Sequence, residues 1–358
     1  MPENNFTLLP FLKSLISTAG LSGNEAPVRE IILQAWRPLA DEITVSRLGS
    51  LHALRRGTGP EPRRRILVSA HMDAIGLIVT GVTDGFLSFT SIGGIDARIL
   101  PGQPVIVHGR EDLPALIVAP PARLLPESMG DGVVPLEYLF ADTGLLPHEV
   151  TRLVRAGDLI SFAQPPQEMN GEILCGHSLD NRASVAALTA CLDELQYRRP
   201  AWDLWAVASV QEEITLGGAA TSAFDLLPDL AVAVDVTFAK GPGSSEFNTF
   251  TMGKGVTLGW GPDVHPGLHR AIKDIADRLE IPYQLEVMPR HSGTDAYALQ
   301  VAAQGIPTMV IGIPLRYMHT PVEIVSLKDI YRAGRLLADV ITRLDPAFLD
   351  TLNVDKPA

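Results

Sequence analysis

Leu204-Trp205-Ala206-Val207-Ala208-Ser209-Val210, followed by Gln211-Glu212-Glu213, joins an apolar run to two adjacent carboxylates. An apolar run of this length that carries Trp and Val and is bounded by polar residues predicts a buried strand. Side chains alternate along a strand, so we expect Glu212 and Glu213 to serve different faces. One could bind a metal ion while the other transfers a proton, provided that other segments bring ligands to the same place.

Composition restricts the class of protein. A chain of 358 residues is long for one compact core, which favours a main domain with one insert. A formal net charge of -12 argues against nucleic acid as a partner. Cys175 and Cys191 form neither a disulfide framework nor a CxxC zinc motif, which favours buried thiols in a reducing compartment. The sequence shows no signal peptide and no membrane helix, so we expect a cytoplasmic protein without a membrane partner.

The chain pattern predicts an α/β domain interrupted by an all-β insert. Helical spacing and short apolar runs alternate through residues 1–75 and again through 169–358. Between residues 76 and 168, short apolar stretches alternate with Gly and Pro turns, and helical periodicity is scarce. We therefore predict a discontinuous catalytic domain, 1–75 and 169–358, and an inserted small β-barrel domain, 76–168.

Local patterns give more detailed expectations. Asp180 stands at the entrance of a helix, where an N-cap is its simplest role. Asp329 is placed to complete a capping box at the last helix. Residues 239–262 are Gly-rich and predict an irregular loop beside a cleft, and Arg63-Arg64-Arg65 predicts a solvated loop. The expected helices are 6–18, 26–36, 183–195, 266–279 and 326–344, and the expected strands are 42–54 (a pair), 66–70, 204–210, 230–234, 281–287 and 308–313.

A histidine and an aspartate directly follow the predicted strand at residues 66–70. His71 and Asp73 lie two positions apart, so in extended chain they face the same side. Asp73 can then orient the imidazole, as a carboxylate usually does behind a metal-binding histidine. A histidine satisfied within the core is the alternative that this motif alone leaves open.

Polar residues follow strand after strand at the carboxyl end. They are His71, Asp73, Glu212, Glu213, Asp235 and His319. In an open α/β sheet this edge is the ligand crevice. Buried charges need partners, and Lys and Arg are few near these positions. We infer that a metal ion supplies the missing positive charge.

The ligand types indicate which metal and how many ions. Two imidazoles mixed with carboxylates favour zinc-like metals, because calcium and magnesium prefer oxygen ligands alone. There are more ligands than one ion uses, and Asp180 is the candidate to bridge two ions ~3.5 to 4 Å apart. Glu212, the carboxylate left over, would act as general base and later as proton donor.

The motifs together resemble one known family. They are Ala70-His71-Met72-Asp73, Leu179-Asp180-Asn181-Arg182, Gln211-Glu212-Glu213, Asp235-Val236-Thr237, Gly293-Thr294-Asp295-Ala296 and Tyr317-Met318-His319-Thr320-Pro321. In order and spacing they resemble the tetrahedral (TET) aminopeptidases, dinuclear metallopeptidases that include glutamyl aminopeptidase-like members and proteins labelled endoglucanase. The resemblance covers nearly the whole chain, including the position of the insert.

This resemblance implies a fold, a site and an assembly. The fold would be a mixed β-sheet flanked by helices, as in zinc aminopeptidases, with a barrel that mediates dimerisation. Two divalent metal ions per subunit are implied, zinc first, with cobalt or manganese as alternatives. Short peptides would be the substrates, and dimers would assemble into a hollow dodecamer. The implied roles are His71 and Asp235 on one ion, Glu213 and His319 on the other, Asp180 bridging, Glu212 as base and Asp73 behind His71.

Two positions depart from the family pattern. Thr215-Leu216-Gly217-Gly218 stands where related sequences commonly carry Gly-Leu-Arg-Gly, so an Arg is missing. This departure concerns substrate preference or assembly rather than the ligand set. His177 stands where many relatives have Lys, and here a solvent-facing loop position is favoured over a pocket position.

The main hypothesis is metal-dependent removal of N-terminal residues from short peptides, and three alternatives stay open. A related co-catalytic metallohydrolase would remove acyl groups or C-terminal residues. A glycoside hydrolase needs paired carboxylates but no histidine ligands. A metal-binding assembly protein without turnover would fit the altered segment Thr215 to Gly218.

Overall fold

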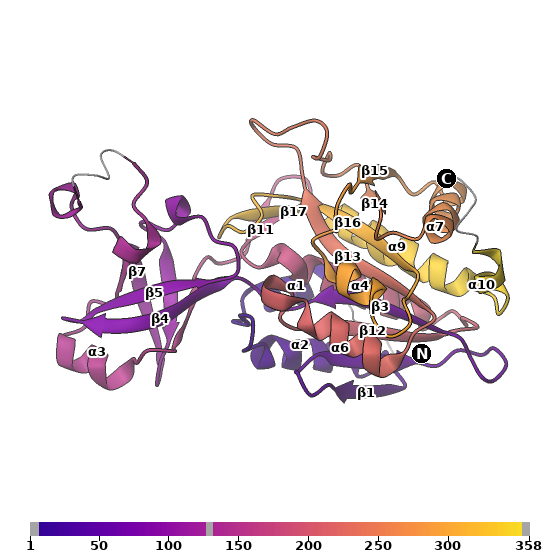
Figure 1. Ribbon diagram of the computed structural model, residues 1–358, viewed down its shortest axis with the longest axis horizontal. Helices are drawn as coiled ribbons and strands as arrows, with labels where there is room; N and C mark the ends of the chain where they lie inside the picture. Colours follow the sequence, from indigo (N-terminus) through magenta and orange to yellow (C-terminus); the bar gives the residue numbers. More distant parts are fainter. Residues whose placement is uncertain (1–6, 127–131, 353–358) are drawn as a thin grey trace.

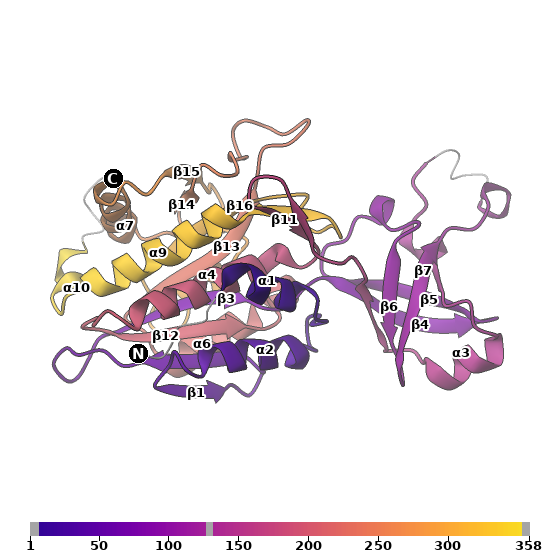
Figure 2. The ribbon, with the colours of Figure 1, turned by 180° about the vertical axis from the view of Figure 1, so that it is seen from behind.

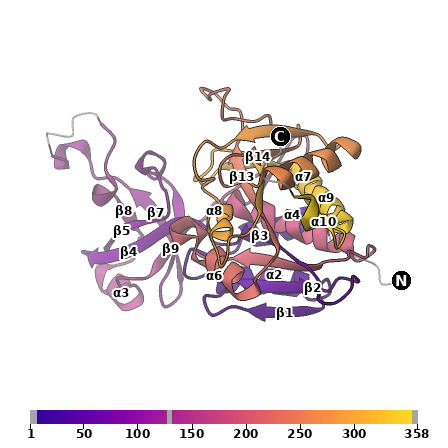
Figure 3. The same ribbon diagram turned by 45° about the vertical axis from the view of Figure 1, so that its right-hand side comes forward.

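The computed structural model describes residues 7–126 and 132–352. Figures 1 and 3 show an α/β body with a smaller β-barrel standing to one side of it. Each part has its own hydrophobic core, and the core of the barrel contains only residues between Leu77 and Phe162. Within the described residues, no helix is both long enough and apolar enough to cross a bilayer.

The body is built on an eleven-stranded mixed sheet. Its main path runs, in spatial order, β1 (Glu42–Val45), β2 (Leu51–Arg55), β12 (Asp203–Ser209), β3 (Arg65–His71), β13 (Leu230–Phe238), β16 (Thr308–Arg316), β17 (Glu323–Ser326), β11 (Ile173–Gly176) and β10 (Gln167–Met169). Two further strands, β14 (Val256–Trp260) and β15 (Tyr283–Val287), join through β16. The four central strands β12, β3, β13 and β16 are parallel, so their carboxyl ends share one edge.

Helices cover both faces of this sheet. Figure 2 shows one group in front of it, which comprises α1 (Leu8–Ile16), α2 (Ala26–Trp36), α4 (Leu179–Leu195) and α9 (Leu327–Arg343). The other face carries α6 (Gly217–Leu226), which packs against α8 (Asp295–Gln300). The remaining helices are α5 (Glu212–Thr215), α7 (Pro266–Arg278) and α10 (Phe348–Thr351). Because both faces are covered, the central strands are apolar almost throughout, as parallel strands usually are.

The two long helices α4 and α9 approach each other closely at one glycine. A Cβ added at Gly334 would lie 2.5 Å from the Ala187 carbonyl oxygen, so a larger residue would push the helices apart. Alanines along α4 keep the contact surface flat, which lets both helices bury their apolar sides. This packing holds the start of α4, which carries Asp180, against the sheet.

The insert is a closed six-stranded barrel. Its strands, in spatial order, are β4 (Gly76–Thr83), β5 (Phe86–Ile92), β8 (Phe140–Asp142), β7 (Asp112–Val118), β6 (Pro104–His108) and β9 (Leu159–Phe162). It also carries α3 (Pro147–Leu153) and the short 3-10 turns Ala97–Ile99, Ala122–Leu124 and Leu136–Tyr138. Alternate residues of the strands, such as Leu113, Ala115 and Ile117, face the interior. The predicted fold class, a helix-flanked mixed sheet with an inserted barrel, is confirmed, while the exact boundaries at 75 and 168 stay a prediction.

Some local predictions differ from the structure. The strand predicted to end before Asp235 continues to Phe238, and the segment 239–262 contains strand β14 between glycines that suggested a loop. Strands β10, β11 and β17 were not predicted because each is only three or four residues long. Asp329 does not form a capping box; its carboxylate accepts from the backbone N–H groups of Gly253 and Gly255 instead.

Candidate metal centre

The carboxyl edge of the parallel strands brings the predicted ligands together. His71 is the last residue of β3, and Asp235 lies near the end of β13. Helix α5 follows β12 and carries Glu212 and Glu213, while His319 follows β16. These side chains line one cavity of about 530 Å³ together with Asp180. The crevice expected at this edge therefore exists in the structure.

Asp180 lies between the two histidines. Its Oδ1 is 3.2 Å from His71 Nε2, and its Oδ2 is 3.3 Å from His319 Nε2. An N-cap was the simplest role expected of Asp180, beside the hypothesis of a bridging ligand. In the structure Ser178 holds the N-cap position, and the backbone of Asp180 departs from helical geometry inside the first turn of α4. This bend at the start of α4 turns the carboxylate away from the helix and into the cavity. Each oxygen of Asp180 thus faces a different imidazole.

The three other carboxylates divide between the same two histidines. Glu212 Oε2 and Asp235 Oδ1 each lie 3.7 Å from His71 Nε2. Glu213 Oε2 lies 3.3 Å from His319 Nε2. Glu212 and Glu213 do not alternate along a strand as predicted, because they stand on the single-turn helix α5. Successive helical residues point about 100° apart, so the pair still reaches two different parts of the cavity.

Asp73 supports this arrangement from behind. Its Oδ1 lies 3.5 Å from His71 Nδ1, and its carboxylate accepts hydrogen bonds from the backbone N–H groups of Glu212 and Glu213 at 3.0 and 3.3 Å. The hydroxyl of Ser22 donates to the same carboxylate at 2.6 Å. Asp73 is fully buried, so it fixes His71 and the start of α5 relative to each other without facing the cavity.

The charges in this cavity are poorly compensated by the protein. Burial raises the pKa of Glu212 to about 8 and, with the charge of Asp180, the pKa of Glu213 to about 7. Burial also raises the pKa of Asp235 well above its usual value. The pKa of His319 is raised to about 9 by its hydrogen bond to Asp180. Burial thus makes the carboxyls harder to ionise, while the imidazole of His319 holds its proton because a carboxylate faces it.

The residues present fit a metal centre. His71 with Glu212 and Asp235, and His71 with Asp180 and Glu213, form two groups whose possible ligand atoms lie within 4.8 Å of one another. Among the described residues that line the cavity there is no Lys or Arg. Imidazole and carboxylate donors at such spacing suit zinc and related divalent ions. A buried cluster of acids without a cation of its own is satisfied by metal binding.

Two acids that sequence reasoning missed position the ligands. Glu323 is buried, and its carboxylate accepts from the backbone N–H groups of Asp180 and His319 at 3.1 and 2.9 Å. Glu25 accepts from the N–H groups of Gly23 and Gln211 at 2.7 and 3.3 Å. The signal for Glu323 was a lone acid beside the apolar pair Ile324-Val325. Glu25 ends the early stretch Leu21-Ser22-Gly23-Asn24-Glu25, which the family resemblance also covers but which suggested no role for this acid.

The barrel also reaches the site. A Cβ added at Gly94, in the segment after β5, would lie 3.0 Å from His319 Nδ1. A Cβ at the neighbouring Gly93 would lie 3.5 Å from Glu213 Oε2. Because these two glycines have no side chains, the barrel segment lies directly against the predicted ligands Glu213 and His319.

His177 was predicted to be a solvent-facing loop residue, and this prediction is wrong. It is buried, and its Nδ1 lies 2.7 Å from the hydroxyl oxygen of Ser178. Burial, with the nearby charge of Arg182, lowers the pKa of His177 to about 3. The prediction failed because the segment between β11 and α4 is packed under other elements and is not an open loop. Cys175 and Cys191, in contrast, are buried free thiols as predicted.

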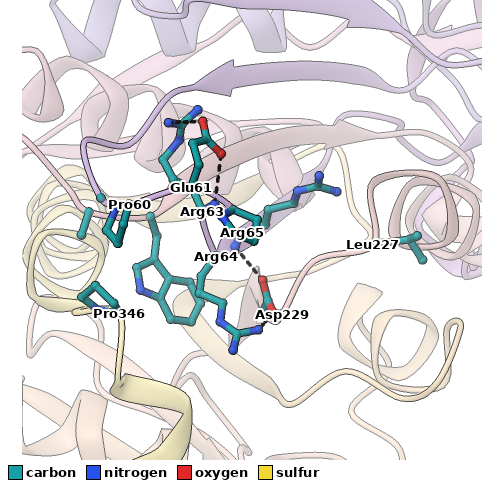
Figure 4. A pocket seen from close by; sticks show the side chains of 12 residues that line it. Pro60, Glu61, Arg63, Arg64, Arg65, Leu227, Asp229 and Pro346 are labelled. Carbon is teal, nitrogen blue, oxygen red and sulfur yellow. Dashed lines mark hydrogen bonds and ion pairs between the residues drawn. The ribbon is translucent and has the colours of Figure 1, made fainter.

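A second hollow of about 530 Å³ lies at the opposite, amino end of the central strands. Figure 4 shows Arg63, Arg64 and Arg65 lining it beside Glu61 and Asp229. Arg63 pairs with Glu61 and, at 2.8 Å, with Asp203, and Arg64 pairs with Asp229 at 2.8 Å. Arg65 donates to the carbonyl of Leu226. Arg63 and Arg64 are therefore paired with acids of the same chain, and Arg65 is hydrogen-bonded to its backbone.

A mixed sheet covered by helices, an inserted barrel and a histidine–carboxylate cluster at the carboxyl edge define a metallopeptidase. The chain belongs to the M42 glutamyl aminopeptidase family, whose sequence pattern matches residues 49–336. The family consists of metallopeptidases, and the chain is a peptide hydrolase.

Similar proteins agree with this membership. A putative aminopeptidase of Acetivibrio thermocellus is 33% identical over 93% of this chain and 98% of its own length. The lysyl aminopeptidase of Pyrococcus furiosus is 31% identical over 94% and 97%. The TET aminopeptidase of a marine Thaumarchaeota archaeon superposes with a TM-score of 0.91 at 31% identity, covering 97% of this chain and 99% of that one. The Pyrococcus horikoshii TET1 peptidase, which can assemble into a tetrahedron or a large octahedral shell, gives a TM-score of 0.82 at 30% identity, covering 94% and 100%.

Proposed function

We propose that the protein is a dinuclear metal-dependent aminopeptidase that removes N-terminal residues from short peptides, with Glu212 as general base. The observation that carries this proposal is the position of Asp180, whose two oxygens face His71 and His319 at 3.2 and 3.3 Å. A carboxylate held between two imidazoles suits a bridging ligand. Glycoside hydrolysis has no need of such histidines.

The proposed ligand sets follow from the neighbours of each histidine. His71 and Asp235 would hold one ion, Glu213 and His319 the other, and Asp180 both. Glu323 and Asp73 would hold these ligands in place through the hydrogen bonds that they accept. Metal-binding residues usually have such a supporting layer, and its loss commonly weakens metal affinity.

Glu212 is the acid that these sets leave free. Its side chain is only 9% exposed, and its backbone N–H is tied to Asp73. Two divalent ions would supply Lewis acidity and a water of lowered pKa. Glu212 would take the proton from the attacking water and then deliver it to the leaving amine, so that its carboxylate is regenerated in each cycle.

The assembly and the metal are part of the proposal. The barrel would mediate dimerisation, and dimers would build a dodecamer that admits short peptides, in keeping with the shells described for the Pyrococcus horikoshii TET1 peptidase. Zinc is the metal we expect first, with cobalt or manganese as alternatives that the same ligands accept. We expect the protein to act in the cytoplasm.

The test of the base is Glu212→Gln. This change keeps the size of the side chain but removes the proton acceptor, so kcat toward aminoacyl anilides is expected to fall about 10²- to 10⁴-fold. Bound metal, measured by elemental analysis, is expected to stay the same. Glu213→Gln is the matched comparison at the neighbouring position, and there metal content should fall together with activity.

Full activity of Glu212→Gln with metal still bound would contradict the role of Glu212. A substrate panel of free and N-acetylated peptides tests the class of reaction. Hydrolysis of the free peptides only is expected from an aminopeptidase. Preference for the acetylated peptides would instead identify a deacylase-type metallohydrolase, and bound metal without any hydrolysis would identify a binding protein.

A further inference from the structure

One carboxylate in the cavity, Glu286, stands apart from the proposed metal ligands. It lies on β15, and its side chain lines the same cavity as His71 and Asp235. Its Oε1 accepts from the hydroxyl of Thr237 at 2.6 Å, and its Oε2 accepts from the hydroxyl of Thr257 at 2.5 Å. No ion pair joins Glu286 to a Lys or Arg among the described residues. The protein therefore orients this acid but does not neutralise it.

The strand register places this carboxylate beside the metal centre. Thr237 follows Asp235 by two positions on β13, so both side chains leave the same face of the strand. Gly312 is the register partner of Asp235 on one side and of Thr257 on the other. The hydrogen bond from Thr237 thus anchors the Glu286 carboxylate to a position on β13 that lies one two-residue step, roughly 6.6 Å between backbone positions, beyond Asp235.

A glycine makes room for the acid. A Cβ added at Gly312 would lie 2.2 Å from the Thr257 hydroxyl oxygen and 3.0 Å from Glu286 Oε2. Any larger residue there would displace the threonine and crowd the carboxylate. The same cavity also has the apolar side chains of Met288 and Val310 in its wall.

We propose that Glu286 selects peptides whose N-terminal residue is lysine or arginine. The inference rests on the proposed function, because it takes the reacting N-terminal residue to sit at the metal centre. A lysine side chain spans roughly 6 Å from Cα to Nζ, by standard bond lengths. An N-terminal lysine at the metal centre would therefore carry its ammonium group into the part of the cavity that Glu286 lines. Its aliphatic part would lie along Met288 and Val310 while the ammonium meets the carboxylate. An acidic side chain in the same place would meet like charge.

Two ligands that differ in one group test this assignment. L-lysine and L-norleucine have the same carbon chain, but norleucine ends in a methyl group where lysine carries an ammonium group on the same carbon. Calorimetry on the full-length, metal-loaded protein is expected to show about 10- to 100-fold tighter binding of lysine, the range for one charge-assisted hydrogen bond in a shielded site. Equal affinity for the two amino acids would overturn the proposal.

The variant Glu286→Gln tests the residue itself. The ratio of lysine to norleucine affinity, and the ratio of kcat/KM for lysyl and norleucyl anilides, are both expected to fall at least about 10-fold. Glu280→Gln is the matched control, because it removes the same charge from an exposed side chain six positions earlier and should keep both ratios. A merely structural role of Glu286 would weaken both ligands alike and leave the ratios unchanged, which would overturn the proposal.

A length series keeps the test decisive even if Glu286→Gln does not fold. Ornithine is shorter than lysine by one methylene group and 2,3-diaminopropionate by three, so affinity for the unaltered protein should fall stepwise. Equal binding of all three would overturn the proposal. Cleavage of norleucyl anilide without a preference for lysyl anilide would refute the proposed role of Glu286 but would leave the proposed aminopeptidase activity intact. A lysine preference in binding without hydrolysis of any anilide would support the role of Glu286 but contradict the aminopeptidase activity.

Discussion

Two hollows of similar volume open at opposite ends of the same parallel strands, and they treat charge in opposite ways. At the amino end, the arginines of the run 63–65 pair with Glu61, Asp203, Asp229 and a backbone carbonyl. At the carboxyl end, the acids that line the cavity face histidines, and no Lys or Arg lines that cavity among the described residues. Concave shape is therefore not what distinguishes a site. The difference is whether the chain supplies the counter-charge itself.

The same difference in charge pairing predicts that the two hollows contribute differently to the free energy of folding. Paired groups at the amino end stabilise the fold modestly, as surface ion pairs do. Like charges gathered at the carboxyl end oppose folding until something positive binds, which is the usual cost of a functional site. Changes at the two ends should therefore have different, and in one case opposite, effects.

The largest expected effect is that of removing metal. Treatment with a chelator should abolish hydrolysis and lower the melting temperature, and zinc should restore both. A ligand present at 100 times its dissociation constant stabilises the folded state by about 2.7 kcal/mol. For a chain of 358 residues, each kcal/mol shifts Tm by about 1–2 °C. Scanning calorimetry with and without chelator measures the shift.

The two ends give the controls for this experiment. Asp180→Asn should lose the stabilisation by zinc, whereas Asp203→Asn, at the amino end, should keep it. Zinc-dependent stabilisation that survives in Asp180→Asn would show that the metal binds elsewhere, and that the acids at the carboxyl end do not need it.

The next effect is a difference of sign between two identical substitutions. In the metal-free protein, Asp235→Asn should raise stability by about 1 kcal/mol or more, since it removes one of several buried acids that lack a cation. Asp203→Asn should lower it by about 1–2 kcal/mol, because Asp203 accepts from the Gly57 N–H at 2.7 Å and from Arg63. Urea unfolding measures both. Destabilisation by both variants would show that the acids at the carboxyl end are already compensated.

The smallest effect concerns His177, which lies at the carboxyl end but faces Arg182 and not the acids. Its pKa falls from about 6.5 in the unfolded chain to about 3, so the folded state favours the neutral imidazole. Its contribution to stability is complete above about pH 6.5 and is lost as the pH falls towards 3. Between pH 7.5 and 5.5 this loss is about 1 kcal/mol.

His177→Gln isolates that contribution, because it removes one titrating group and leaves the others. The stability difference between pH 7.5 and 5.5, taken from urea unfolding, should be about 1 kcal/mol smaller in the variant. An unchanged difference would mean that His177 is already protonated or exposed in the folded protein.

The sequence predicted the fold and the candidate ligands for one physical reason. His71, Asp235 and His319 each end or follow an apolar run of the sequence, and polar groups in that place are costly without a function. Such residues stand out in the sequence before any tertiary contact is known. The order of elements, with a β-rich segment between two α/β segments, was visible for the same kind of reason, since strand and helix periods differ.

Other features could not be predicted, because they depend on contacts between distant segments. Glu286 gains its position from Thr237 and Thr257, which belong to two other strands. Glu323 matters only because β17 runs beside β11 and so reaches Asp180. The single-turn helix α5 is too short to show a helical period. In each case the decisive information is which strands are neighbours.

The residues of the candidate centre and of its supporting hydrogen bonds lie far apart in the sequence, and this has a consequence for biosynthesis. The site needs residues from almost the whole length of the chain, beginning with Ser22 and ending with Glu323. A chain still being made on the ribosome therefore cannot hold a complete centre, whatever metal is present. The full set of residues in the candidate centre is therefore present only when synthesis of the chain is nearly finished.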